Sequence, residues 1–347
     1  MRIICDIHNK ISEIAPALRK LALDVHANPE LGFQERKACA WQMEILRRRG
    51  FDVECPFRGI ETAYLAKKGS GRPAVCFLSE YDALPGLGHA CGHNLICAAS
   101  IGAGIALSEL IDKGGIKGSV YIAGTPAEEG KGGKLHFVSA GVFKRMDAAL
   151  MAHPETYASP WNGCLAIERY DVTFHGRASH ASTAPEKGIN ALDAVLLLFQ
   201  GVNAWRQQLP ETSRAHGIIS HGGDAPNIIP DKASCRFYLR SDKMSVLKAM
   251  GRRFRDIARG AALMTGTRLD FSKAKEGYKA GIVNKVLNRE FAKVAESLGM
   301  DALSSDGGRG SSDFGDVSQE LPGIHFYFKA VKEDAPIHSA RFQQMSS

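Results

Sequence analysis

Residues 74–94 read AVCFLSEYDALPGLGHACGHN and hold the most informative pattern in the chain. The first six residues are apolar on both sides, which is typical of a short buried strand. The stretch ends with His89, Cys91 and His93 at alternate positions between glycines. Alternate side chains of an extended segment point to one side, so these three could converge on one point. They could form a metal site, a thiolate nucleophile with its base, or neither.

Similar apolar runs follow at 119–125 (SVYIAGT) and 148–153 (AALMAH), with a small-residue helix expected over 95–110. Strands that alternate with helices favour an α/β layer with a largely parallel sheet. Upstream, apolar residues at steps of three and four predict a helix that ends at Asn28-Pro29 and whose regular part begins near Pro16. A second helix is expected over 35–49.

The pattern changes near Gly163. Residues 166–176 and 233–242 alternate between apolar and polar, as half-exposed strands do. Helices are expected after each of them, one capped by Asn190 and ending near 209, the other over 245–263. Helix followed by strand returns after Tyr278, with a strand at 324–328. We therefore predict a discontinuous α/β domain (1–163 and 278–347) interrupted by an inserted α+β domain (164–277).

Polar side chains gather where the predicted strands end. Asp82 follows the first strand, Glu128 and Glu129 follow the second, and His153 ends the third. Open α/β sheets bind ligands at this edge, and Glu, Asp, His and Cys are donors that divalent metals require. Adjacent glutamates point in different directions, so one could bind metal while the other takes a proton from a metal-activated water.

Two other interpretations stay open at this point. Cys91 could be a nucleophile with His93 or His153 as its base. The cluster could also be a structural zinc site, although such sites are usually closed by Cys and His alone. Neither interpretation uses the Glu128-Glu129 pair.

Bulk composition narrows the class of protein. The net charge of +7 over 347 residues is modest and spread along the chain, so we expect no nucleic-acid partner. No apolar run approaches the roughly 18 residues of a membrane span, so no membrane partner is expected. The eight cysteines include no CxxC pair, which favours reduced thiols and a cytoplasmic location.

Six blocks occur in the order seen in the M20 metallopeptidases, and the chain resembles this family over nearly its whole length. They are EYDALPGLGHACGHN, GTPAEEGKGGK, MAHP, GRASHASTAPEKGINALDA, GGDAPNIIPDKA and GSSDFGDVSQELPGIH. The resemblance is strongest to the branch of p-aminobenzoyl-glutamate hydrolase and the β-alanyl-lysine dipeptidases. It implies a zinc-peptidase-like catalytic α/β domain with an inserted α+β lid and dimerisation domain.

The same resemblance implies the chemistry. A homodimer would hydrolyse the amide bond of a small N-acyl amino acid or dipeptide, using two divalent metal ions (zinc or manganese, with cobalt as a further candidate). The alternative is an inactive or truncated member of the fold that still binds metal or peptide. Relatives continue through a C-terminal helix after the last ligand, so we expect the ordering of His338 to be weakened here.

Motif by motif, the resemblance assigns a role to individual residues. Glu128 is the implied general base, and Asp82 is an outer carboxylate that orients a ligand imidazole. In the inserted domain His180 matches the lid histidine that reaches the active site of the other protomer and stabilises the oxyanion, and Asn227 matches a substrate-binding residue. The implied metal ligands are Cys91, His93, Glu129, His153 and His338, with His325 as a fallback.

Overall fold

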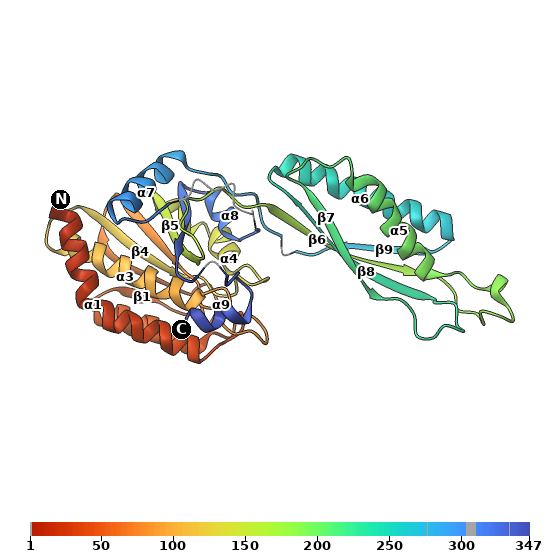
Figure 1. The fold of residues 1–347 in the computed structure, drawn as a ribbon, viewed down its shortest axis with the longest axis horizontal. Coiled ribbons are helices and arrows are strands. Elements are labelled where there is room, and N and C mark those ends of the chain that lie inside the picture. The colour runs from red at the N-terminus through yellow and green to blue at the C-terminus, as the bar shows by residue number, and fades with distance from the viewer. Residues whose placement is uncertain (1, 276, 303–309, 333) are drawn as a thin grey trace. The chain divides into compact units, whose positions relative to one another are not determined.

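The computed structural model describes residues 2–275, 277–302, 310–332 and 334–347. The chain divides into two compact units (Figure 1). The larger unit comprises Met1–Gly163 with Gly281–Ser347, and the smaller unit is Cys164–Ala280. Each has its own sheet and its own hydrophobic core.

A six-stranded mixed sheet forms the centre of the larger unit, in the order β1-β2-β4-β3-β5-β10. Strands β4, β3, β5 and β10 are parallel, which confirms the α/β prediction, whereas β2 is antiparallel to β4 and β1 to β2. The sequence analysis missed this antiparallel edge, because β2 reads YLAKKGS and is apolar only at its start. The strands are β1 (Asp52–Glu54), β2 (Tyr64–Ser70), β3 (Ala74–Ser79), β4 (Gly118–Gly124), β5 (Ala148–Glu155) and β10 (Gly323–Lys329).

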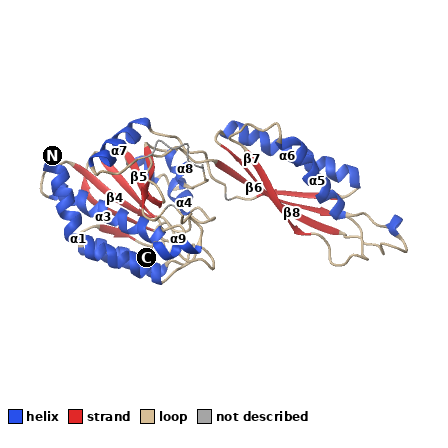
Figure 2. Ribbon diagram, in the orientation of Figure 1, coloured by secondary structure: helices blue, strands red, loops and turns tan. Residues whose placement is uncertain are grey.

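Helices cover both faces of this sheet (Figures 1 and 2). On one face α3 packs against β3, β4 and β5, and α1 and α2 pack on α3. Helices α7 and α8 contact β10, and α4 packs against α8. The helices are α1 (Arg2–Ala27), α2 (Arg36–Arg48), α3 (His93–Asp112), α4 (Gly133–Ser139), the 3-10 turn η1 (Val142–Arg145), α7 (Lys285–Ser297), α8 (Phe314–Ser318) and α9 (Ala340–Met345).

Helix α1 corrects the expected start near Pro16, because it is continuous through that proline. A proline inside a helix removes one hydrogen bond and costs about 3 kcal/mol. The helix also buries Ile14, Leu21 and Val25, and it packs along α3. Full burial of each such side chain contributes about 1.5–3 kcal/mol, so the packing outweighs the proline.

Helix α3 is the one helix among the described residues that is long and apolar enough to span a membrane by length and composition. The sequence analysis missed it as a long apolar segment, because serines and glycines interrupt the run. Its apolar stretch is 67% buried and lies against three strands of the sheet, as the central helix of an α/β unit does.

The smaller unit is an antiparallel sheet in the order β7-β8-β6-β9, with α5 and α6 packed against it. Asn190 caps α5 as predicted, since its Oδ1 accepts hydrogen bonds from the backbone N of Leu192 at 2.9 Å and of Asp193 at 3.3 Å. The elements are β6 (Ala166–His175), the 3-10 turn η2 (Pro185–Lys187), α5 (Ala191–Arg206), β7 (Arg214–His221), β8 (Lys232–Ser241), α6 (Met244–Thr265) and β9 (Arg268–Lys273).

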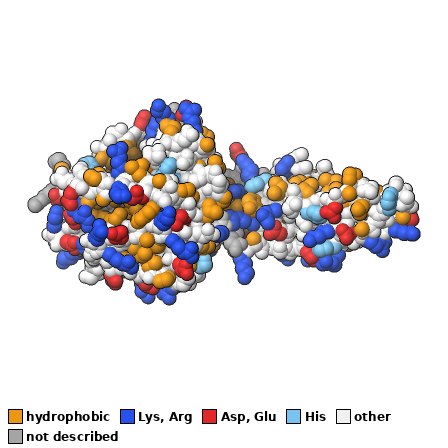
Figure 3. Space-filling view, turned by 90° about the horizontal axis from the view of Figure 1, so that it is seen from below, with side chains coloured by type: hydrophobic (Ala, Val, Ile, Leu, Met, Phe, Trp, Pro, Cys, Tyr) orange, Lys and Arg blue, Asp and Glu red, His pale blue; other side chains and the backbone are white. Residues whose placement is uncertain are grey.

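Apolar side chains remain exposed on the smaller unit. Ile218 on β7 and Leu263 and Met264 on α6 are more than half exposed, at 64%, 84% and 67%. Figure 3 shows hydrophobic side chains gathered along one edge of this unit. Exposed apolar surface of this kind often marks a contact with another protein.

Candidate active site

The turn between β3 and α3 places two ligand-type side chains beside each other. Cys91 and His93 flank Gly92, which has a φ of 73° and precedes α3. A Cβ atom at Gly92 would lie 2.4 Å from Cγ of Pro154, so only glycine fits both the left-handed backbone and the space. The glycines of this motif therefore allow the close approach of the turn to the end of β5.

Asp82 orients His93. Its Oδ1 lies 3.0 Å from His93 Nδ1, and both side chains are buried. Its Oδ2 accepts a hydrogen bond from the backbone N of Glu129 at 2.9 Å. Burial alone would raise the pKa of Asp82, but the charge and hydrogen bond of His93 lower it below its usual value. One ionised carboxylate thus fixes side chains of both loops and leaves Nε2 of His93 for another partner.

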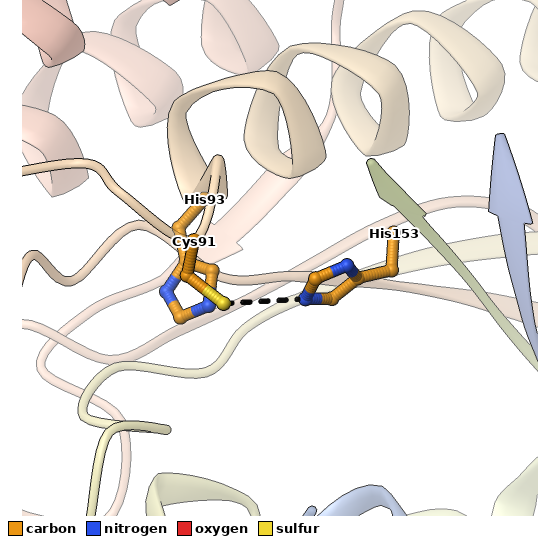
Figure 4. A group of neighbouring side chains, drawn as sticks. All are labelled: Cys91, His93 and His153. Atoms are coloured by element: carbon orange, nitrogen blue, oxygen red, sulfur yellow. Dashed lines mark hydrogen bonds between the residues drawn. The ribbon is translucent and has the colours of Figure 1, made fainter. Parts of the chain in front are cut away.

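His153 lies near the carboxyl end of β5 with its ring held in one tautomer. Nδ1 donates to the backbone carbonyl of Pro154 at 2.8 Å, so the other ring nitrogen carries a lone pair. That Nε2 lies 3.6 Å from Sγ of Cys91 (Figure 4). Burial lowers the pKa of His153 to about 4, so the ring is neutral at pH 7 and can act as a ligand.

The C-terminal segment brings His338 to the same place. Its Nε2 lies 3.4 Å from Oε1 of Glu129. The backbone N of His338 donates to the carbonyl of Ala90 at 2.8 Å, which ties the segment to the Cys91 turn. The histidine is therefore held by a backbone hydrogen bond, despite the weaker ordering that we expected.

The implied ligands form overlapping groups of donors whose atoms all lie within 4.8 Å of one another. Cys91, His93 and Glu129 each belong to more than one group, so the donors surround neighbouring positions. The groups are Cys91 with His93 and His153, Cys91 with Glu129 and His338, His93 with Glu128 and Glu129, and Glu80 with Glu128 and Asp313.

Protonation separates the roles of Glu128 and Cys91. Burial, followed by the charges of Glu80 and Asp313, raises the pKa of Glu128 well above its usual value. A raised pKa suits a carboxylate that accepts a proton and later returns it. Burial also raises the pKa of the Cys91 thiol, which disfavours a free thiolate in the absence of a cation.

A buried ion cluster beside the site was missed from the sequence. The ammonium group of Lys134 on α4 contacts Glu80 and lies 2.6 Å from Oδ1 of Asp313. The backbone N of Lys134 donates to the other oxygen of Asp313 at 3.0 Å. All three side chains are buried. The signal was present in the lysine that ends GKGGK and the aspartate of SSDFGD, but no local pattern joins them.

The remaining predicted residues lie elsewhere. His180 and Asn227 belong to the smaller unit, where Nδ1 of His180 accepts from the backbone N of Ser182 and Thr183, each at 3.3 Å. The backbone carbonyl of Asn227 accepts from Ala181 at 3.0 Å. His325 is buried on β10 with its ring centroid 5.3 Å from that of His153. Within the described part of the chain, His325 belongs to none of the four donor groups.

Comparisons with known proteins agree with this arrangement. Residues 167–263, within the smaller unit, match the peptidase dimerisation domain of the M20 family. Xaa-Arg dipeptidase of Mus musculus is 37% identical and is aligned over 96% of this chain and 81% of its own length. A p-aminobenzoyl-glutamate hydrolase polypeptide from Escherichia coli is 34% identical over 82% of this chain and 63% of its own length.

Solved structures share the fold. A dinuclear metal-binding peptidase of the M20 family from Bacillus subtilis superimposes with a TM-score of 0.74 at 20% identity, covering 96% of this chain and 97% of that protein. The identity to the mouse dipeptidase extends over both units of the chain, not over the dimerisation domain alone. The chain therefore belongs to the M20 family of peptidases, enzymes that hydrolyse amide bonds.

Proposed function

We propose that the chain is a metal-dependent amidohydrolase that cleaves the amide bond of small dipeptides or N-acyl amino acids. The overlap of the donor groups at Cys91, His93 and Glu129 carries this proposal, because it offers neighbouring positions for two divalent ions. The names of the relatives, a dipeptidase and a p-aminobenzoyl-glutamate hydrolase, support the substrate class.

The donor set fits divalent metals. Thiolate, imidazole and carboxylate ligands together suit zinc, manganese or cobalt. Nε2 of His93 is buried and makes no hydrogen bond to any residue that the structure describes. Such an atom calls for a partner, and a metal ion would supply it. When bound, two such ions would polarise the amide carbonyl and lower the pKa of a water molecule toward about 7.

The side chains then divide the work. Glu128 takes a proton from the attacking water and delivers it to the leaving amine. We assign substrate binding to His180 and Asn227, with His180 also stabilising the oxyanion. The match to a dimerisation domain and the exposed Ile218, Leu263 and Met264 support a homodimer formed through the smaller unit.

A cysteine hydrolase is the competing function. It would need a Cys91 thiolate in the free enzyme, whereas burial raises the pKa of this thiol. A purely structural zinc site is disfavoured by the carboxylates of Glu128 and Glu129, since such sites are usually built from Cys and His.

Removing metal tests the proposed function directly. We expect about two divalent ions per chain by elemental analysis, and hydrolysis of p-aminobenzoyl-glutamate or of dipeptides ending in a basic residue, abolished by chelation and restored by metal. Metal without turnover would indicate an inactive member of the fold. Activity that survives chelation but is lost on thiol alkylation would instead assign the reaction to Cys91.

Changing Asp82 tests the support of the ligands. Asp82→Asn should weaken metal affinity about 10–100-fold, the usual effect of losing an outer-shell partner, because Asp82 holds both His93 and the Glu129 backbone. Asp147→Asn is a matched control: this carboxylate also accepts from a backbone amide, that of Ala74 at 2.7 Å, but lies outside the donor groups. Isothermal titration with zinc measures both variants, and equal affinities would contradict the role of Asp82.

A further inference from the structure

Residues 30–35, here called the strap, connect α1 to α2 and lie against both loops that carry the acidic residues of the site. Ala83, next to Asp82, donates its backbone N–H to the carbonyl of Glu30 at 2.8 Å, and Leu31 forms a parallel bridge with Ala83. On the other loop Nζ of Lys131 donates to the carbonyl of Gly32 at 3.0 Å. The strap therefore joins the loop after β3 to the loop after β4.

Its last residue makes the most buried of these contacts. Oε1 of Glu35 accepts a hydrogen bond from the backbone N of Ala127 at 2.8 Å, and both residues are fully buried. A buried backbone N–H needs a partner, and here a side chain from 92 residues away supplies it. Ala127 directly precedes Glu128 and Glu129.

Ala127 has an unfavourable backbone conformation. Its φ of 62° lies in the left-handed region, which a residue with a Cβ adopts only when its surroundings hold it there. The carbonyl of Ala127 accepts from the backbone N of Gly132 at 2.8 Å, so both of its peptide groups are fixed. Gly32 of the strap leaves just enough room, since a Cβ there would lie 2.8 Å from Cβ of Ala127.

We propose that Glu35 is a positioning residue, whose hydrogen bond to Ala127 holds the turn that directs Glu128 and Glu129 to their separate places. This inference rests on the proposed roles of those two glutamates as base and ligand. A small misplacement of a catalytic group can cost about 10²-fold in rate, so the loss of this single contact should be visible in turnover.

The hydrogen bond, and not the charge, is the feature that matters. Burial, with the nearby charge of Asp82, raises the pKa of Glu35 to about 7, so its carboxyl group is partly neutral at physiological pH. Glutamine keeps a carbonyl oxygen at the same position and can still accept from Ala127. Leucine fills a similar volume but offers no acceptor.

The experiment compares Glu35→Gln, Glu35→Leu and a control from the neighbouring helix α2. Gln42 is also fully buried, and its Oε1 accepts from Tyr64 at 2.9 Å, but it does not contact the turn at Ala127. Amide hydrogen exchange of the peptide spanning 124–135 is measured in the chelated protein, and kcat and KM in the metal-loaded protein. We expect Glu35→Leu to speed exchange at this peptide and to lower kcat about 10²-fold with little change in KM. Glu35→Gln should stay within a few-fold of the wild type, and Gln42→Leu should lower the melting temperature alone.

Gly32→Ala provides a second route to the same turn if Glu35→Leu does not fold. Its new Cβ presses on Ala127 from the strap, so faster exchange at 124–135 and a lower kcat are again expected. Unchanged exchange in a folded Glu35→Leu or Gly32→Ala variant, or a kcat loss no larger than that of Gln42→Leu, would overturn the positioning role. Exchange in the chelated protein depends on neither metal nor turnover. Faster exchange in the variants of an enzyme whose base proves not to be Glu128 would therefore keep the strap contact and remove only the proposed function.

Discussion

Glu128→Gln is expected to lower kcat by about 10²–10⁴-fold, the range that general acid–base catalysis contributes, while metal content stays at about two ions per chain. Glutamine has the size of glutamate but cannot accept a proton from the attacking water. Glu128 is the carboxylate whose pKa is raised by burial and by its acidic neighbours, which suits a group that receives a proton and passes it on. Steady-state kinetics and elemental analysis on the same preparation separate the loss of the base from the loss of metal.

The matched control is Glu155→Gln. Glu155 lies at the end of β5, and its Oε2 accepts from the backbone N of Thr156 at 2.8 Å, but it belongs to none of the donor groups found among the described residues. Turnover of this variant should match that of the wild type. A Glu128→Gln enzyme that keeps kcat within a few-fold would move the general base to another residue.

Local pattern was sufficient to predict the parts of the site that follow strands. The runs at 74–79, 119–125 and 148–153 are β3, β4 and β5, and parallel neighbours bring the residues after them to one edge. That rule alone places Asp82, the Glu128-Glu129 pair and His153 near one another. The position of His338 came only from the family resemblance, because it follows no predicted strand.

Contacts between distant segments could not be predicted. Lys134 and Asp313 are 179 residues apart, and Glu35 and Ala127 are 92 residues apart. A buried lysine or glutamate has the same letter as a solvated one, and its partner is known only once the chain is folded. Strand β2 was missed for a related reason, since its pairing with β4 fixes YLAKKGS as a strand although most of its side chains are polar or exposed.

Glu129→Ala is expected to reduce the metal content from about two ions per chain to about one and to lower kcat/KM by about 10³-fold or more. Glu129 belongs to two donor groups, one with Cys91 and His338 and one with His93 and Glu128. Alanine removes a ligand from both. The group of Cys91, His93 and His153 keeps all its donors, so one position should still bind metal.

His338→Ala gives the graded comparison that identifies the position lost. His338 belongs to one donor group and its side chain is 49% exposed, so its removal weakens a single position and leaves the contacts of Glu129 with Asp82 intact. Zinc titration should therefore show one site of reduced affinity in His338→Ala, where Glu129→Ala lacks that site altogether. Two sites of unchanged affinity in Glu129→Ala would mean that this carboxylate binds no metal. The roles within the glutamate pair would then have to be reversed, with Glu128 as the ligand and Glu129, held by Asp82, as the base.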